Sequence, residues 1–214
     1  MPYNQAAVTF TLIVAAGFLL GSCPWGYWLV RVFRGEDIRA HGSGGIGATN
    51  VWRTYGRRLG LAVVALDVAK GFAPAFWGVH AVSSLCGILA GAAAMAGHAR
   101  PVFLRFEKGG KMVATAGGAF FGVAPLVGAA SAGVWIVVFA LTRYASVASI
   151  VASGSLPLWA WLFGYPWPVI AFGAFAGLGV LVLHRANLGR LWRGEENRST
   201  LWRRWWKPTS AANP

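Results

Sequence analysis

The chain has 214 residues, of which 57% are hydrophobic and only 12% are charged. Soluble domains carry about 25% charged residues, so this composition excludes an ordinary water-soluble enzyme, a disordered chain and a disulfide-stapled secreted domain. The net charge of +13 is gathered in short segments between long uncharged stretches. The sequence therefore predicts an all-α protein that crosses a membrane several times.

Six apolar stretches are long enough, or nearly so, to cross a bilayer, which takes about 20 residues as a helix. The fourth would measure ~46 Å as one helix, which is too long for one ordinary crossing. We expect it to break near Pro125 into two short spans. The stretches are residues 6–30, 60–82, 85–99, 112–142, 146–163 and 168–183.

The distribution of basic residues decides between six and seven spans. With seven spans and the N-terminus outside, every Lys and Arg except Lys70 falls on the cytoplasmic side, as the positive-inside rule requires. We therefore predict a seven-transmembrane-helix bundle with a cytoplasmic C-terminus, and six spans as the alternative. Residues 1–190 would form a single transmembrane domain, and residues 191–214 a basic, Trp-rich cytoplasmic tail at the membrane interface.

The first polar segment, residues 41–53, reads HGSGGIGATNVWR. Its glycines allow positive φ angles, so successive N–H groups can turn toward one anion, and Arg53 can add a bidentate contact to phosphate. The spacing of Gly42, Gly44 and Gly47 also matches the dinucleotide fingerprint. That fingerprint requires a βαβ unit, whereas a transmembrane helix precedes it here.

The second polar segment, residues 106–115, reads FEKGGKMVAT. Gly109 and Gly110 lie between Lys108 and Lys111 at the start of an apolar helix. Free N–H groups and the positive end of the helix dipole would face an anion there. A flexible basic loop that faces lipid headgroups is the alternative.

The third polar segment, residues 184–196, reads HRANLGRLWRGEE and follows the last span. His184 and Asn187 are three residues apart, so they share one face of a helix. Such a pair could orient a polar substrate, although a single interfacial histidine can equally be a structural hydrogen-bonding group. In the predicted threading all three polar segments lie on the cytoplasmic side.

Together, these ordered segments closely resemble the three signature motifs of the bacterial acyl-phosphate:glycerol-3-phosphate acyltransferases. The resemblance extends from about residue 19 to residue 196. Two positions depart from the family pattern: Gly45, where the family usually has Asn, and Met112, where it usually has a third Gly. The matching residues are Ser43, Gly44, Gly47, Asn50, Arg53, Lys108, Gly109, Gly110, Lys111, His184, Asn187 and Glu196.

The resemblance implies an integral enzyme of the bacterial inner membrane, with its active site on the cytoplasmic face. It would transfer a fatty acyl group from acyl phosphate to the 1-hydroxyl of sn-glycerol 3-phosphate, giving lysophosphatidic acid and phosphate in the first step of phospholipid biosynthesis. It implies no cofactor, no metal and no nucleic acid. Membrane lipid and an enzyme that produces acyl phosphate are the expected partners.

The resemblance also implies roles for individual residues. Ser43, Lys111, His184 and Asn187 would be catalytic, with His184 or the substrate's own phosphate as proton acceptor. Ser43 could instead cap the turn that follows it. The substrate-binding residues would be Ser43, Gly44, Gly47, Asn50, Arg53, Lys108, Gly109, Gly110, Lys111, His184 and Asn187.

Three charged residues are expected to be structural. Asp67 and Lys70 lie three apart within one span, and we expect them to pair with each other or to contact the mouth of the site, because a lone charge in a membrane is costly. Glu196 should pair with Arg190 or Arg193. Two other functions remain open: a transporter of an organic phosphate, which would predict internal repeats, and a scaffold for other lipid enzymes.

Overall fold

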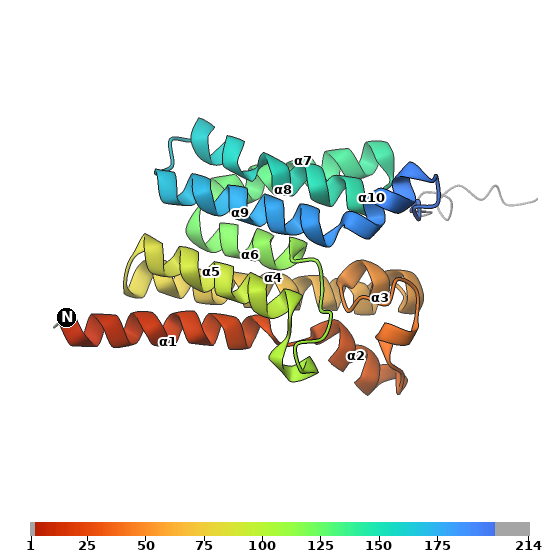
Figure 1. Ribbon diagram of the computed structural model, residues 1–214, viewed down its shortest axis with the longest axis horizontal. Coiled ribbons are helices and arrows are strands. Elements are labelled where there is room, and N and C mark those ends of the chain that lie inside the picture. The colour runs from red at the N-terminus through yellow and green to blue at the C-terminus, as the bar shows by residue number, and fades with distance from the viewer. Residues whose placement is uncertain (1–2, 200–214) are drawn as a thin grey trace, which may run out of the picture.

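The computed structural model describes residues 3–199, and every regular element in that range is helical. Figure 1 shows α1, α4 and α5 on one side of the bundle, α7, α8 and α9 on the other, and α6 between them. The short helices α2, α3 and α10 gather at one end. The helices are α1 (Tyr3–Gly21), α2 (Trp25–Arg34), α3 (Ala48–Tyr55), α4 (Arg57–Ala81), α5 (Ser84–Ala99), α6 (Val113–Val123), α7 (Pro125–Thr142), α8 (Ala145–Leu162), α9 (Trp167–Leu183) and α10 (Arg185–Trp192), with 3-10 turns η1 (Ile38–Ala40) and η2 (Val102–Leu104).

The longest apolar stretch is divided where the sequence predicted. Helix α6 ends at Val123, and α7 begins at Pro125 after the single residue Ala124. Proline fits the first turn of a helix, where its missing N–H is not needed, and disfavours helical geometry in the residue before it. The predicted break near Pro125 is confirmed.

The first apolar stretch is not the continuous helix that was expected over residues 6–30. Helix α1 ends at Gly21 and α2 begins at Trp25. Pro24 cannot donate a backbone hydrogen bond and restricts the residue before it. The carbonyl oxygen of Cys23 instead accepts a hydrogen bond from Lys70 Nζ at 2.8 Å, so a side chain of α4 satisfies the broken backbone.

The predicted pairing of Asp67 with Lys70 is present. Lys70 Nζ lies 2.8 Å from Asp67 Oδ1, and both side chains are 3% exposed. His98, in the last turn of α5, places Nδ1 3.6 Å from the same carboxylate oxygen. This buried cluster joins α4 to α5 and, through Cys23, to the end of α1.

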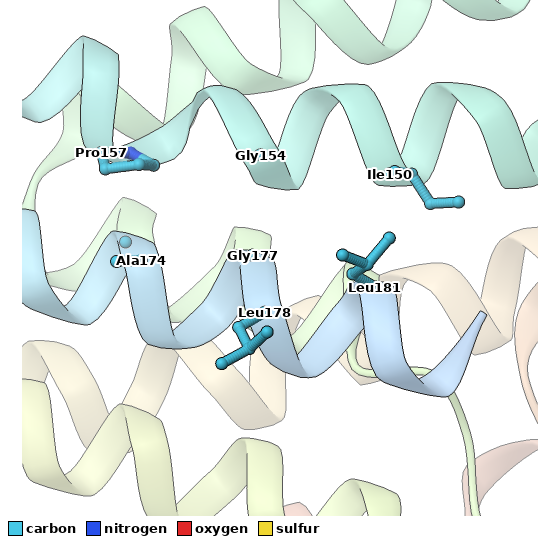
Figure 2. Close-up of a pocket in the computed structure, with 8 residues that line it drawn as sticks. Ile150, Gly154, Pro157, Ala174, Gly177, Leu178 and Leu181 are labelled. Atoms are coloured by element: carbon cyan, nitrogen blue, oxygen red, sulfur yellow. The ribbon is translucent and has the colours of Figure 1, made fainter. Parts of the chain in front are cut away.

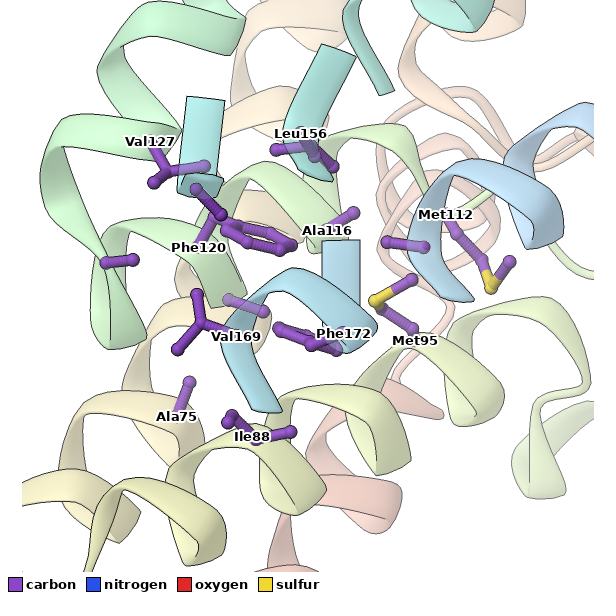
Figure 3. Packing of buried hydrophobic residues seen from close by; sticks show 14 of the residues in the cluster. Ala75, Ile88, Met95, Met112, Ala116, Phe120, Val127, Leu156, Val169 and Phe172 are labelled. Carbon is purple, nitrogen blue, oxygen red and sulfur yellow. The ribbon is translucent and has the colours of Figure 1, made fainter. Parts of the chain in front are cut away.

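Small residues allow the central helices to approach closely. A Cβ atom at Gly71 of α4 or Gly118 of α6 would overlap the backbone of the facing helix, which is the small-residue packing typical of membrane helices. The largest apolar cluster lies between the two sides of the bundle, where Phe120 and Phe172 stack at 4.7 Å between ring centroids (Figure 3). This packing fixes α6 and α9, the two helices that lead into the polar end.

Of the helices in the described range, α1, α4, α7 and α8 are each long and apolar enough to cross a membrane alone. Helices α9 and α10 form a pair bent by 56°, and α6 has only 11 residues. The seven-span count and the orientation of the termini stay predictions. So does the boundary at residue 190, and most of the predicted tail, residues 200–214, lies outside the described residues.

Candidate active site

Asn50 organises the first polar loop. Its Oδ1 accepts from the backbone N–H of Ser43 at 3.0 Å, and its Nδ2 donates to the carbonyl oxygens of His41 at 3.0 Å and Gly45 at 2.8 Å. Asn50 is buried at the start of α3. Asn50 therefore shapes the first polar loop, and the substrate-binding role expected of it stays a prediction.

The glycines of this loop behave partly as predicted. Gly42 and Gly44 have φ angles of +59° and +68°, which most side chains avoid. Gly47 is the N-cap of α3 in an extended conformation. Because Gly47 occupies that position, Ser43 is not the cap of this helix, and Ser43 lies exposed on the loop.

The second polar loop differs from the prediction in the use of its amides. The N–H of Gly109 donates to the carbonyl oxygen of Ala99, and the N–H of Gly110 donates to that of His98, both at 3.0 Å. The last carbonyl groups of a helix lack intrahelical donors, so the end of α5 competes for these amides. In this structure the Gly109 and Gly110 amides are therefore bound to the end of α5, and their binding of an anion stays a prediction. The N–H groups of the first turn of α6 remain as backbone donors.

The two loops tolerate a new side chain very differently. A Cβ atom at Gly110 would overlap the imidazole of buried His98, whereas one at Gly45 would lie 3.7 Å from Ser43 Oγ, an ordinary contact. We expect Gly110→Ala to lower the free energy of unfolding by about 1–3 kcal/mol through overpacking. Gly45→Asn should change it by less than about 0.5 kcal/mol. Equal unfolding midpoints for the two variants in detergent would contradict this account.

Lys111 connects the second and third polar segments. Its Nζ donates to Asn187 Oδ1 at 2.6 Å, and Asn187 Nδ2 donates to Glu196 Oε1 at 2.6 Å. Glu196 also accepts from Ser146 Oγ at 2.8 Å and pairs with Arg190 Nε at 2.8 Å. Both ends of the Asn187 amide are thereby fixed, and its oxygen must face the lysine.

The structural role predicted for Glu196 agrees with these contacts. Of the two predicted partners, it pairs with Arg190, and Arg193 pairs with Glu195 at 2.8 Å. Burial alone would raise the pKa of Glu196, but hydrogen bonds from Asn187, Ser146 and Arg190 outweigh burial and hold it below its usual value. Glu196 is thus an ionised anchor for the third segment.

Charged residues from all three polar segments interact electrostatically. Burial lowers the pKa of Lys111 to about 8; Glu196 opposes this shift, and Arg190, Lys108 and Arg53 add to it. Partial burial likewise lowers the pKa of Arg53, which interacts with Glu196 and Arg190. One carboxylate therefore faces several cations, and the excess positive charge is suited to an anionic ligand.

His184 lies where α9 meets α10 and is 3% exposed. Its Nδ1 is 2.8 Å from the carbonyl oxygen of Val180. A carbonyl can only accept, so Nδ1 carries the hydrogen, and Nε2 of the neutral ring is then a free acceptor. Burial lowers the pKa of His184 to about 4, so the ring is neutral, and this arrangement fits a residue that accepts a hydrogen bond from a substrate hydroxyl.

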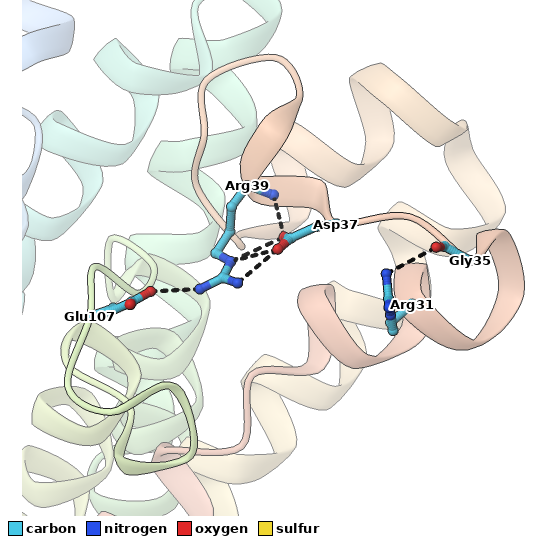
Figure 4. Close-up of polar contacts among 5 residues, drawn as sticks. All are labelled: Arg31, Gly35, Asp37, Arg39 and Glu107. Atoms are coloured by element: carbon cyan, nitrogen blue, oxygen red, sulfur yellow. Dashed lines mark hydrogen bonds and ion pairs between the residues drawn. The ribbon is translucent and has the colours of Figure 1, made fainter.

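A second contact ties the first loop to the second. Arg39 forms a bidentate pair with Asp37, with NH2 and Oδ2 2.7 Å apart, and its NH1 lies 2.6 Å from Glu107 Oε2 (Figure 4).

Three residues with contacts at the polar end, Arg39, Glu107 and Ser146, were not predicted from the sequence. A lone serine at the start of an apolar stretch carries no local signal, since its partner Glu196 is 50 residues away.

Met112, the second departure from the family pattern, adopts φ +66°. Its side chain is nevertheless buried in the main core, and it occupies the space beside Gly179 of α9. The backbone thus has the positive φ that favours the glycine usual in the family, while the methionine side chain supplies packing that a glycine would lose.

Met112→Gly relieves about 1 kcal/mol of backbone strain but removes a buried side chain worth about 2–5 kcal/mol. We expect a net loss of roughly 1–4 kcal/mol in the free energy of unfolding. A Cβ atom at Gly179 would lie 2.5 Å from Met112 Cε, so Gly179→Ala should recover stability only when Met112 is already Gly. Unfolding of both single variants and the double variant measures this coupling, and additive effects would contradict it.

The fold and this site define an apolar helical bundle with a cluster of cationic and polar side chains at one end. The chain belongs to the glycerol-3-phosphate acyltransferase family, whose sequence model matches residues 11–194. A curated glycerol-3-phosphate acyltransferase of Desulforudis audaxviator is 46% identical over 91% of this chain and 98% of its own. One of Aquifex aeolicus is 41% identical over 87% of this chain and 97% of its own.

Solved structures agree. A crystal structure of PlsY (YgiH), described as an integral membrane glycerol 3-phosphate acyltransferase in its glycerol 3-phosphate form, superposes with a TM-score of 0.87 at 38% identity, covering 93% of this chain and 100% of that chain. Its lysophosphatidic acid form gives a TM-score of 0.83, also at 38% identity, covering 90% of this chain and 97% of that chain. The chain is accordingly an integral membrane acyltransferase of lipid biosynthesis.

Proposed function

We propose that this enzyme transfers a fatty acyl group from acyl phosphate to the 1-hydroxyl of sn-glycerol 3-phosphate. The hydroxyl oxygen attacks the carbonyl carbon, the bond from that carbon to the phosphate oxygen breaks, and inorganic phosphate leaves. The product, lysophosphatidic acid, is the first intermediate of phospholipid synthesis. An enzyme that produces acyl phosphate would supply the donor, and the reaction would take place at the cytoplasmic face of the inner membrane.

The observation that carries this proposal is the meeting of three distant segments around Lys111. Lys111 donates a hydrogen bond to Asn187 at 2.6 Å. Its positive charge also interacts with those of Arg53, Lys108 and Arg190. Both proposed substrates carry phosphate, so two anions must be held together. The solved structures of PlsY in glycerol 3-phosphate and lysophosphatidic acid forms support a site of this kind.

The residues divide between binding and chemistry. Ser43 and Arg53, with the loop that contains Gly44 and Gly47, would hold one phosphate. Lys111, assisted by Lys108 and the first turn of α6, would stabilise the second phosphate and the oxyanion that develops on the carbonyl. Gly109 and Gly110 would support this site through their backbone hydrogen bonds to the end of α5.

His184 and Asn187 would orient glycerol 3-phosphate. The hydroxyl proton would pass to His184 Nε2 or to the phosphate of the substrate, and a pH–rate profile of His184→Ala distinguishes the two. The donor is already activated, so positioning and charge stabilisation suffice for the protein. Thioester-using acyltransferases have the pattern His-x4-Asp, in which an Asp lies five residues after a His. None of the four histidines in the sequence has an Asp at that position, which favours acyl phosphate over an acyl thioester as the donor.

Purified enzyme with palmitoyl phosphate and labelled glycerol 3-phosphate tests this function. We expect equal amounts of lysophosphatidic acid and inorganic phosphate, and no product with palmitoyl-CoA as donor. Binding of glycerol 3-phosphate without product would instead favour a transporter. Unchanged membrane lipid synthesis after replacement of Ser43, Arg53 or Lys111 would favour a scaffold.

A further inference from the structure

An apolar groove runs between α8 and α9, with a volume of about 300 Å³. Figure 2 shows Ile150, Gly154 and Pro157 along one wall and Ala174, Gly177 and Leu181 along the other. No charged residue lines it. The groove lies outside the residues assigned to the reaction above.

The α8 wall leads to the polar site. Pro157, Gly154 and Ile150 follow one another at helical spacing, and the same face continues after four more residues to Ser146. Ser146 donates to Glu196 Oε1 at 2.8 Å, within the polar cluster. This wall therefore ends on a residue that already contacts the site.

The α9 wall leads to the same place. Gly173, Gly177 and Leu181 share one face, and three residues later that face reaches His184. A Cβ atom at Gly177 would lie 2.9 Å from the carbonyl oxygen of Ser153, so the two helices are close along this part of the groove. Both walls, followed in the same direction, arrive at the site.

We infer that this groove holds the hydrocarbon chain of the acyl donor and that Gly154 sets how much of the chain is accommodated; this inference rests on the proposed function. Eight residues of helix, from Pro157 to Ile150, span ~12 Å, which is enough to hold part of an extended fatty acyl chain. Leu178 and Leu181 are 63% and 41% exposed, so the groove opens sideways. A chain dissolved in the membrane can enter it from the side, with its phosphate directed at Lys111.

Gly154 is suited to a substitution that tests this inference, because a Cβ atom there would have no other atom within 4 Å. Gly154→Leu therefore fills the groove without forcing the backbone to move. Gly133 of α7 is also exposed with nothing within 4 Å of a Cβ atom, so Gly133→Leu adds the same side chain away from the groove. Gly154→Ala provides an intermediate size.

The measurement is kcat/KM for octanoyl, dodecanoyl and palmitoyl phosphate with each purified variant. For Gly154→Leu we expect the ratio of palmitoyl to octanoyl to fall about tenfold, since excluded methylene groups lose their apolar contacts. Gly154→Ala should lower it by a smaller factor, and Gly133→Leu should leave it unchanged. The octanoyl rate shows whether each variant is folded.

Identical chain-length profiles for all four proteins would overturn the inference and would indicate that bulk lipid occupies the groove. If Gly154→Leu is inactive with every donor, the Gly154→Ala profile decides in the same way. Failure of the wild type with every acyl phosphate would instead refute the proposed donor. The chain-length ratio can then be measured with whichever acyl donor is used.

Discussion

Replacing Lys111 by methionine is expected to lower kcat/KM by about a thousandfold, the upper range for loss of one preorganised donor to an oxyanion. The side chain is only partly exposed and is held by Asn187 at 2.6 Å, so its charge acts where water is limited. Steady-state rates with purified protein measure the effect. Arg58→Met, which removes an exposed cation from the first turn of α4, should change kcat/KM by less than twofold, roughly.

The pH dependence gives this prediction a second test. Lys111 has a pKa lowered to about 8, so it is charged below that pH and becomes neutral as the pH rises. The second pKa of a phosphate group is about 6, so the phosphate groups of the substrates do not titrate near pH 8. We expect kcat/KM to fall above pH 8 in the wild type, and this limb to be absent in Lys111→Arg, because a guanidinium stays charged beyond about pH 12. A limb that persists in Lys111→Arg would show that another group titrates.

The largest effect on stability is expected from Lys70→Met. It leaves the buried Asp67 carboxylate without its partner at 2.8 Å and the carbonyl oxygen of Cys23 without its donor. Removing one member of a buried ion pair costs about 3–5 kcal/mol. Denaturant unfolding in detergent should show a loss of this size.

The double variant Asp67→Leu with Lys70→Met is the matched control. Replacing both members by apolar groups removes the desolvation cost along with the pair, so it should be more stable than Lys70→Met alone. If the double variant loses as much as the sum of both single variants, the pair is not the source of the cost. Folding should be judged by size-exclusion behaviour before unfolding is measured.

Local pattern was enough to predict one helix break and not the other. The run over residues 112–142 is too long for one crossing, so its length alone indicated the break at Pro125. The run over residues 6–30 has an acceptable length, and membrane helices tolerate proline. At its break beside Pro24, the carbonyl oxygen of Cys23 is satisfied by Lys70, which is 47 residues away in the sequence. No local pattern carries that information.

The residues of the site could likewise be predicted from the sequence, but their contacts could not. Motif spacing identified Lys111, Asn187 and Glu196, because their residue types and order are specific to the family. It could not show that Asn187 stands between the other two. Nor could it show that the amides of Gly109 and Gly110 donate to carbonyl oxygens at the end of α5. In the sequence, a glycine pair before a helix indicates an anion-binding loop, because the carbonyl groups that compete for its amides are not known.

The interruption at Pro24 has a further consequence for how the reactants meet. Helix α1 alone, with 19 residues, is ~28 Å long, close to the thickness of the hydrocarbon layer. Helix α2 then carries Arg31 and Arg34 beside the exposed side chains of Val32 and Phe33, as in helices that rest at a lipid–water boundary. Helix α2 would fix the depth of the protein in the membrane and so keep the reaction at this boundary. A water-soluble reactant and an oil-soluble one could then combine while each stays in its own solvent.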